Sequence, residues 1–141
     1  MPRASVWLIR AALLHLVVAS GLGAWFLVAK AGGPLPPPRL LSTHAAIALI
    51  GWLAQLTIGV AHWILPKHAA GEARGPALFP WLAFAMLNGG LLATALAPLA
   101  PGLRAGGLAA ALAGIVSFLA GALPRVKAFG TGRPTSSRTL S

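Results

Sequence analysis

The chain has 141 residues, of which 57% are apolar, with a mean hydropathy of +0.82, eleven lysines and arginines, one acidic residue and no cysteine. The absence of cysteine excludes c-type haem attachment, cysteine-ligated iron–sulfur clusters, thiolate copper centres and disulfides. Because Glu72 is the sole carboxylate side chain, a carboxylate-bridged di-iron site and a paired-carboxylate hydrolase are also excluded within one chain.

Four apolar runs follow one another along the chain, and each is close to the roughly 20 residues that cross a ~30 Å hydrocarbon core. They predict membrane spans at about 6–29, 42–65, 77–97 and 104–124, separated by segments rich in glycine, proline or charge. The sequence therefore predicts an all-α integral membrane four-helix bundle over residues 1–127, followed by a flexible cytoplasmic tail at 128–141. An alternative for the first run is a cleaved signal peptide, but the run is longer than the 7 to 15 residues of a typical signal h-region.

The cations are divided unequally between the two predicted membrane faces. With four spans, both termini and the middle loop share one face, which carries eight lysines and arginines, against Lys30, Arg39 and Arg104 on the other. Lysine and arginine accumulate on the cytoplasmic side of short loops, so both termini are predicted to be cytoplasmic. The positive charge then indicates contact with anionic lipid head groups rather than with nucleic acid. Richness in Ala, Gly, Leu, Arg and Pro suggests a bacterial gene, and hence a multi-pass protein of the bacterial cytoplasmic (inner) membrane.

The second span carries a narrow polar stripe. At 100° per residue, His62 lies five full turns beyond His44 on the same helical face, and Gly51 and Gln55 lie about 20° to either side of that line. A helix that contacts only lipid gains nothing from such a stripe, whereas a helix beside a flat cofactor, a file of water or a partner helix uses it.

The four histidines, at positions 15, 44, 62 and 68, are the only strong metal ligands in the sequence. Imidazole without cysteine points to haem b as the metal cofactor of a membrane helix bundle. Each histidine also has an ordinary explanation. His68 can be a solvated loop residue, and His62 can be an interfacial ring that reaches toward water. His15 can form an interhelical hydrogen bond, and His44 can be a residue of the outer interface.

Predicted depth in the membrane decides which histidines can share one iron. His15 and His44 are predicted ~18 Å apart in depth, and His44 and His62 ~27 Å apart along one helix, at 1.5 Å per residue. A single chain therefore offers no pair of axial ligands. In a two-fold dimer, however, His44 and its symmetry mate lie at equal depth, so a homodimer is predicted to supply the second ligand.

The second span resembles a helix of a known superfamily. His44, Gly51-Trp52, Gly59, Ala61 and Leu65-Pro66 resemble the second transmembrane helix of the haem-copper oxidase catalytic subunit, especially of the nitric-oxide reductase large subunit and the C-type cytochrome oxidases. The resemblance continues into the next span at Trp81, Phe84 and Asn88-Gly89. It implies that His44 is an axial ligand of a low-spin haem b near the outer face. His62 stands where the family often has an aromatic residue, so no family role passes to it.

The same resemblance limits what the chain does alone. Family catalytic subunits have about twelve spans, and the later helices that carry the remaining haem and metal ligands have no counterpart here. No catalytic residue is therefore predicted, and a complete oxidase or reductase activity is not expected. The first functional hypothesis is a dimeric haem b protein for electron transfer or for redox or gas sensing. In it His44 is the axial ligand, Gly51 lets the ring approach the helix and Arg39 pairs with a propionate, with His15 and His62 as weaker candidate metal ligands.

The alternative hypothesis is a haem-free accessory or assembly subunit of a respiratory oxidase or nitric-oxide reductase. Gly107, Gly114 and Gly121 recur every seven residues in the fourth span and make a small-residue seam that predicts tight helix association under either hypothesis. A copper or haem delivery factor ranks last, because the only sulfur ligands are Met1 and Met86.

Overall fold

The protein is described by a computed structural model that covers residues 1–65, 76–100 and 102–126. The described residues form helices and contain no strand. These are α1 (Arg3–Lys30), α2 (Arg39–Ala46), the π-helix η1 (Ile47–Ala54), α3 (Gln55–Ile64), α4 (Leu78–Ala95), the 3₁₀ turn η2 (Ala97–Leu99), α5 (Leu103–Ala122) and the 3₁₀ turn η3 (Leu123–Arg125). The elements α2, η1 and α3 follow without a break, so the described part of the chain has four helices long and apolar enough to cross a membrane, which confirms the all-α prediction. The predicted tail at 128–141 lies outside the described residues.

The ends of the helices follow from glycine and proline. After α1, Gly32 takes a φ of +93°, its N–H donates to the Ala29 carbonyl and the Gly33 N–H donates to the Val28 carbonyl. These two bonds make a Schellman motif, which satisfies carbonyls that the helix end leaves free. A proline-rich segment then leads to α2, and the Trp25 indole donates to the Pro34 carbonyl at 3.2 Å. The carboxyl end of α1 is thus tied to the segment that follows it.

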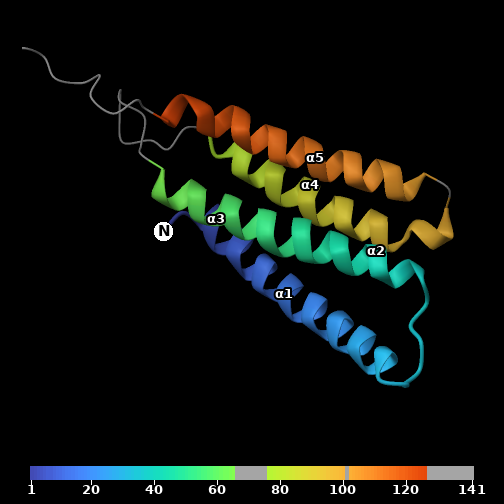
Figure 1. Cartoon of the computed structure of the whole chain (residues 1–141). Helices are drawn as coiled ribbons and strands as arrows, with labels where there is room; N and C mark the ends of the chain where they lie inside the picture. The colour runs from blue at the N-terminus through green and yellow to red at the C-terminus, as the bar shows by residue number, and fades with distance from the viewer. Residues whose placement is uncertain (66–75, 101, 127–141) are drawn as a thin grey trace, which may run out of the picture.

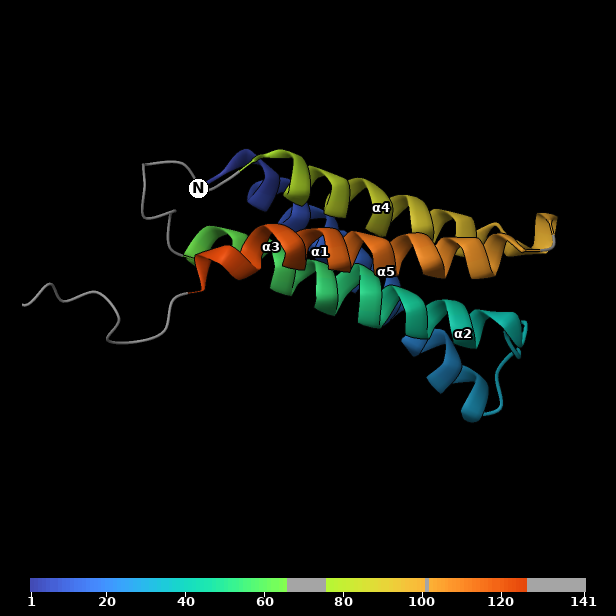
Figure 2. The same ribbon diagram turned by 90° about the horizontal axis from the view of Figure 1, so that it is seen from above.

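The helices run side by side along the length of the molecule (Figures 1 and 2). α4 and α5 form an antiparallel pair, and the continuous α2–η1–α3 rod lies between that pair and α1. The rod packs against α1 with Gly59 beside Leu8, Gly51 beside His15 and His44 beside Gly23. α1 is inclined to the other helices, so that its last turns diverge from α4 and α5 (Figure 1). A groove lies between the carboxyl end of α1, the segment that follows it and α2.

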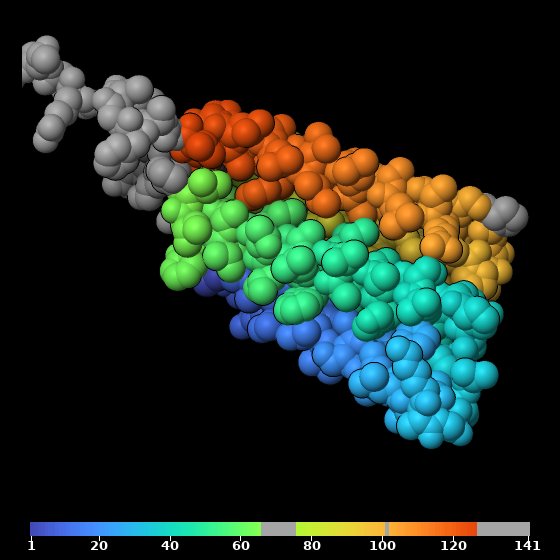
Figure 3. Space-filling model, viewed as in Figure 1, coloured from blue at the N-terminus to red at the C-terminus, as the bar shows by residue number. Residues whose placement is uncertain are grey.

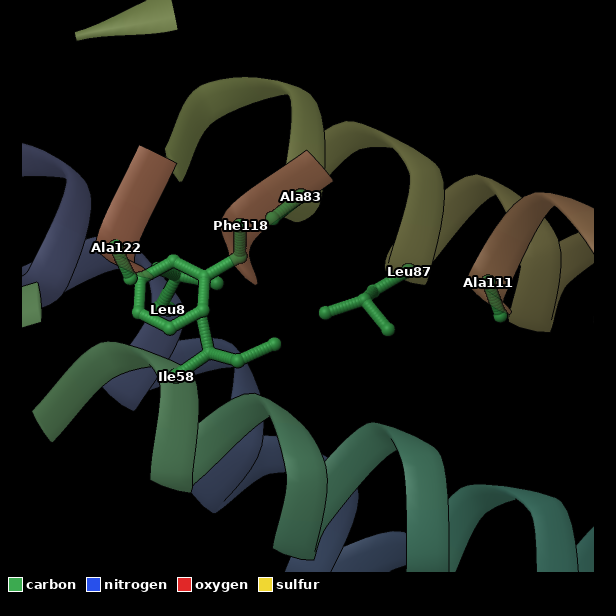
Figure 4. Packing of buried hydrophobic residues seen from close by; sticks show 7 residues of the cluster. All are labelled: Leu8, Ile58, Ala83, Leu87, Ala111, Phe118 and Ala122. Atoms are coloured by element: carbon green, nitrogen blue, oxygen red, sulfur yellow. The ribbon is translucent and has the colours of Figure 1, made fainter. Parts of the chain in front are cut away.

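The apolar core lies where all four helices meet (Figure 4). Leu8 of α1, Ile58 of α3 and Phe118 of α5 gather there with Leu87 and small residues of α4 and α5. Large apolar side chains cover the outer surface instead, where Leu14, Val17 and Leu112 are each more than 60% exposed. Such a surface suits a hydrocarbon solvent.

The glycine seam of the fourth helix is confirmed, and its partner is α4. Gly107 faces Gly90 and Thr94, Gly114 faces Ala83 and Met86, and Gly121 faces Phe79. The neighbouring Gly106 has no heavy atom within 4 Å of the position of an added Cβ. The seven-residue period therefore identified the face that packs, because every second turn of α5 returns to the same side.

The polar stripe of the second span meets a different helix at each of its two ends. His44 contacts Gly23 and Phe26 of α1, whereas His62 contacts Phe118 of α5 and Arg125 of η3. Between them η1 is wound as a π-helix, with i→i+5 hydrogen bonds and a wider turn than the assumed α-helix. The stripe is nevertheless internal, since Gly51, Gln55 and His62 are buried.

Candidate functional site

His44 lies in a groove between the last turns of α1, the proline-rich segment and α2. The groove has a volume of about 490 Å³, and its other lining residues are Gly23, Phe26, Ala29, Lys30, Leu35, Pro36 and Leu41. The His44 ring meets the Phe26 ring edge-to-face, with centroids 5.9 Å apart, and its Cε1 lies 3.4 Å from the Cβ position of Gly23. Its Nδ1 is buried without a hydrogen-bond partner in the described part of the chain, so packing against α1 sets the orientation of the ring.

The charge on this groove comes from Lys30 and not from Arg39. Lys30, the last residue of α1, lines the groove together with His44. Arg39 lines a different groove, shared by α2, η2 and α5. The predicted pairing of Arg39 with a propionate beside His44 is therefore not favoured by the side on which Arg39 lies. Arg39 lies five residues before His44 in α2, so 100° per residue places the two about 140° apart; Lys30 was missed because the sequence does not show which neighbouring helix faces His44.

His15 does not join His44. Its ring fills the space beside Gly51, where an added Cβ would lie 2.8 Å from Cγ of His15 and 2.9 Å from Cδ1 of Leu91. Because Gly51 has no side chain, the ring of His15 from α1 can lie against it. His15 lies eight residues from Gly23, the residue beside His44, which places the two rings about 12 Å apart along α1 rather than ~18 Å. α2 begins at Arg39, about one turn earlier than predicted, which accounts for about 4.5 Å of this difference.

The contact of His15 with Gly51 predicts a non-additive pair of substitutions. Gly51→Ala is expected to destabilise the protein by about 1–3 kcal/mol, because the new methyl group overlaps the imidazole. In the His15→Ala background the same change is expected to cost at least about 0.5 kcal/mol less. Unfolding of the four proteins in mild detergent measures this coupling. Gly21→Ala, where no heavy atom lies within 4 Å of the added Cβ, is the control, and additive costs for Gly51 and His15 would contradict the contact.

His62 belongs to a buried polar cluster at the other end of the bundle. The Arg125 guanidinium, which is 1% exposed, places Nη1 3.3 Å from Nδ1 of His62 and donates from Nη2 to the carbonyls of His62 at 3.3 Å and Leu65 at 2.8 Å. Arg125 thereby caps the carboxyl end of α3, where helix carbonyls lack partners and carry partial negative charge. His62 is held as part of this cap. From the sequence, Arg125 was predicted only to be a cytoplasmic cation. Its position directly after a proline at a helix end could have indicated that it lies beside the end of a neighbouring helix.

Other buried polar groups have no partner among the described residues. These are Oγ of Ser5, Nδ1 of His15, both amide atoms of Gln55 and Oγ of Ser117. Gln55 is completely buried, although it lies in the middle of the rod. An unpaired amide in such surroundings is costly.

Among the described residues, no three histidine, aspartate or glutamate side chains come together as a metal-ion site. His68 and Glu72 lie outside the described residues. What the groove offers is therefore a single imidazole, an aromatic edge, an apolar wall and one cation. This donor set suits a planar metal-bearing cofactor that needs one protein ligand, and it does not suit a bare metal ion.

Comparisons with known proteins give no relative for this chain: no family model, no curated protein and no solved structure matches it. The resemblance of residues 44–66, and of Trp81, Phe84 and Asn88-Gly89 in the next span, to the haem-copper oxidase superfamily therefore stays a prediction that rests on those residues alone.

Proposed function

We propose that the protein is a membrane haem b protein that uses His44 as an axial ligand and serves electron transfer or redox or gas sensing. The observation that carries the proposal is the imidazole of His44 in an apolar groove of about 490 Å³ with Lys30 at its rim. Pockets for cofactors of this size span about 300–1,000 Å³ and are lined mainly by apolar and aromatic groups with a few polar ones. The resemblance of the second span supports the same residue.

The residues of the groove fit the group in three respects. Phe26 and Leu41 offer an apolar surface to a macrocycle, His44 offers a nitrogen to iron, and Lys30 offers a cation to a propionate carboxylate. Gly51 has no part in this proposal, because His15 and Leu91 already fill the space beside it. Bound haem b supplies one-electron chemistry, or an open coordination position for a small gas. The chain orients His44 through Phe26 and Gly23 and excludes water with its apolar wall.

The second axial ligand is proposed to come from a second copy. In the described structure, His15 lies about 12 Å from His44 along α1, too far to face it across one ring. A two-fold axis along the membrane normal brings the His44 residues of two copies to equal depth. Two grooves that face each other in this way enclose haem between the copies and make the homodimer part of the site.

The alternative, a haem-free accessory or assembly subunit of a respiratory complex, is favoured by the surface of α1. Only 11% of an apolar 18-residue stretch of this helix is buried within the chain. The side chains of Leu13, Leu14 and Val17 are at least half exposed. The exposed apolar side chains of α1 give a larger subunit a surface against which it can pack. Under this alternative the exposed face of α1 binds the larger subunit, and His44 does not ligate haem.

A reduced-minus-oxidised visible spectrum of protein purified from haem-supplied cells tests the proposal. We expect sharp α and β bands from the wild type and from His15→Ala, and their complete loss from His44→Ala, because His44 is the one histidine among the residues that line the groove. Size-exclusion profiles of all three proteins keep loss of haem distinct from loss of fold. Bands that survive in monodisperse His44→Ala would contradict the proposal. A featureless wild-type spectrum would leave the accessory-subunit alternative in its place.

A further inference from the structure

Two grooves adjoin at the end of the bundle where α2 and α5 begin and α4 ends. The first, about 370 Å³, is lined by Arg39, Ser42, Thr43, Thr94 and Arg104, among others. The second, about 250 Å³, shares Ser42, Thr94 and Arg104 with it and continues along Ala46, Leu49 and Leu108. In Figure 3 this region lies between the teal residues of α2 and the orange residues of α5, with the yellow α4 behind them. The two grooves together form one furrow, which we call the α2–α5 furrow.

The mouth of the α2–α5 furrow is positively charged. Arg39 and Arg104 come from different helices, are both exposed, and form no side-chain hydrogen bond or ion pair within the described residues. The only acidic side chain of the sequence, Glu72, lies outside the described residues, in the segment between α3 and α4. α2 and α5 also begin at this mouth without a side-chain cap, so their amino ends add partial positive charge. The mouth therefore attracts an anion.

The part of the α2–α5 furrow away from its mouth is apolar. Leu49 lies ten residues beyond Arg39 on the same rod, about 15 Å deeper along the helix. The Thr94 hydroxyl donates to the Gly90 carbonyl at 2.9 Å and the Ser42 hydroxyl to the Arg39 carbonyl at 2.9 Å. Both hydroxyl protons are thus donated to backbone carbonyls. The two guanidinium groups remain as side-chain hydrogen-bond donors at the mouth. A ligand with one charged end and one long apolar end matches this division.

We propose that the α2–α5 furrow binds an anionic phospholipid. The phosphate lies between Arg39 and Arg104, because guanidinium groups bind phosphate oxygens through paired N–H donors. One acyl chain follows Ala46, Leu49 and Leu108. A free phosphate ion uses only the mouth, whereas the apolar length of the furrow favours the lipid. The site is distinct from the groove of His44, which lies against α1, and it does not depend on haem binding.

Native mass spectrometry of the full chain, released from detergent with added phosphatidylglycerol, tests this site. We expect a bound phosphatidylglycerol whose apparent affinity falls about tenfold or more in the Arg39→Gln/Arg104→Gln double variant, because a cation near a membrane surface contributes about fivefold in binding. Lys30→Gln is the matched control. It removes a charge at the same end of the bundle but lines the other groove, so unchanged lipid binding is expected.

A third variant separates lipid from free anion. Ala46→Leu fills the apolar part of the furrow and leaves both arginines in place, so it is expected to reduce bound phosphatidylglycerol as the double variant does. An equal loss in Lys30→Gln would show general charge attraction and overturn the proposal. Undiminished binding in the double variant would also overturn it. If Ala46→Leu keeps full binding while inorganic phosphate displaces the lipid, the site is an anion site only and the lipid proposal fails.

Discussion

Replacing Gly107 by valine is expected to separate α4 from α5 and to remove much of the stability of the bundle. An added Cβ at Gly107 meets the Gly90 carbonyl oxygen, Oγ1 of Thr94 at 2.6 Å and the Thr94 backbone nitrogen at 2.9 Å. Two of these three atoms belong to the backbone of α4 and cannot move away as a flexible side chain does. Overpacking of a core costs about 1–3 kcal/mol, and occasionally more. Because the obstacle is a helix backbone, we expect a loss of at least about 3 kcal/mol.

Gly106→Val is the matched control for this prediction. It introduces the same side chain on the same helix, one residue away, at a position with no heavy atom within 4 Å of the added Cβ. Its effect is expected to stay within about 0.5 kcal/mol, as for surface substitutions in general. Loss of helicity with denaturant or heat in mild detergent measures both proteins. Similar stability of the two valine variants would refute the close approach of α4 and α5.

Arg125→Met is expected to be the most damaging change at a charged residue. The substitution keeps an apolar stem of similar length but removes the donors that the carbonyls of His62 and Leu65 receive, at 3.3 and 2.8 Å. Hydrogen bonds from a charged group contribute about 1.5–3 kcal/mol, and acceptors left buried without a partner add a penalty. We therefore expect a loss of about 3 kcal/mol in the free energy of unfolding.

Two further variants define the cause of that loss. Arg125→Lys keeps the charge but has no planar fork of donors, so it is expected to recover part of the stability and not all of it. Arg10→Gln removes an exposed cation from α1 and is expected to be nearly neutral. Full stability of Arg125→Lys would show that charge alone acts there. Full stability of Arg125→Met would show that the cap on α3 contributes nothing.

The two ends of the bundle have different chemistry. The end with Arg125 is closed, because a buried guanidinium joins η3 to the last turn of α3. The opposite end is open on two sides: the groove of His44 lies against α1, and the α2–α5 furrow lies on the other side of α2. Ligand binding is therefore proposed at the open end, while the closed end holds the helices together.

Much of the fold was predictable because it depends on local chemistry. Gly32 and the prolines that follow it end α1 where the sequence places the loop, and Gly107, Gly114 and Gly121 mark the packed face of α5 by their spacing alone. The candidate site was predicted less completely. His44 was identified, and the structure places it in a groove, but Lys30 replaced Arg39 as the cation beside it. Arg39 and His44 both lie in α2, where 100° per residue puts them about 140° apart, but the sequence does not show that the end of α1 brings Lys30 to the side of His44.

The sequence by itself determined that this chain forms four long apolar helices. In hydrocarbon each helix must satisfy its own backbone hydrogen bonds, so apolar length and the breaks between runs suffice to place the elements. Only the tertiary structure decided which polar groups meet: His15 beside Gly51, Lys30 beside His44 and Arg125 beneath the carbonyls of α3. These contacts depend on the tilt of α1, the winding of η1 and the approach of α5, and each is set by packing between residues far apart in the chain.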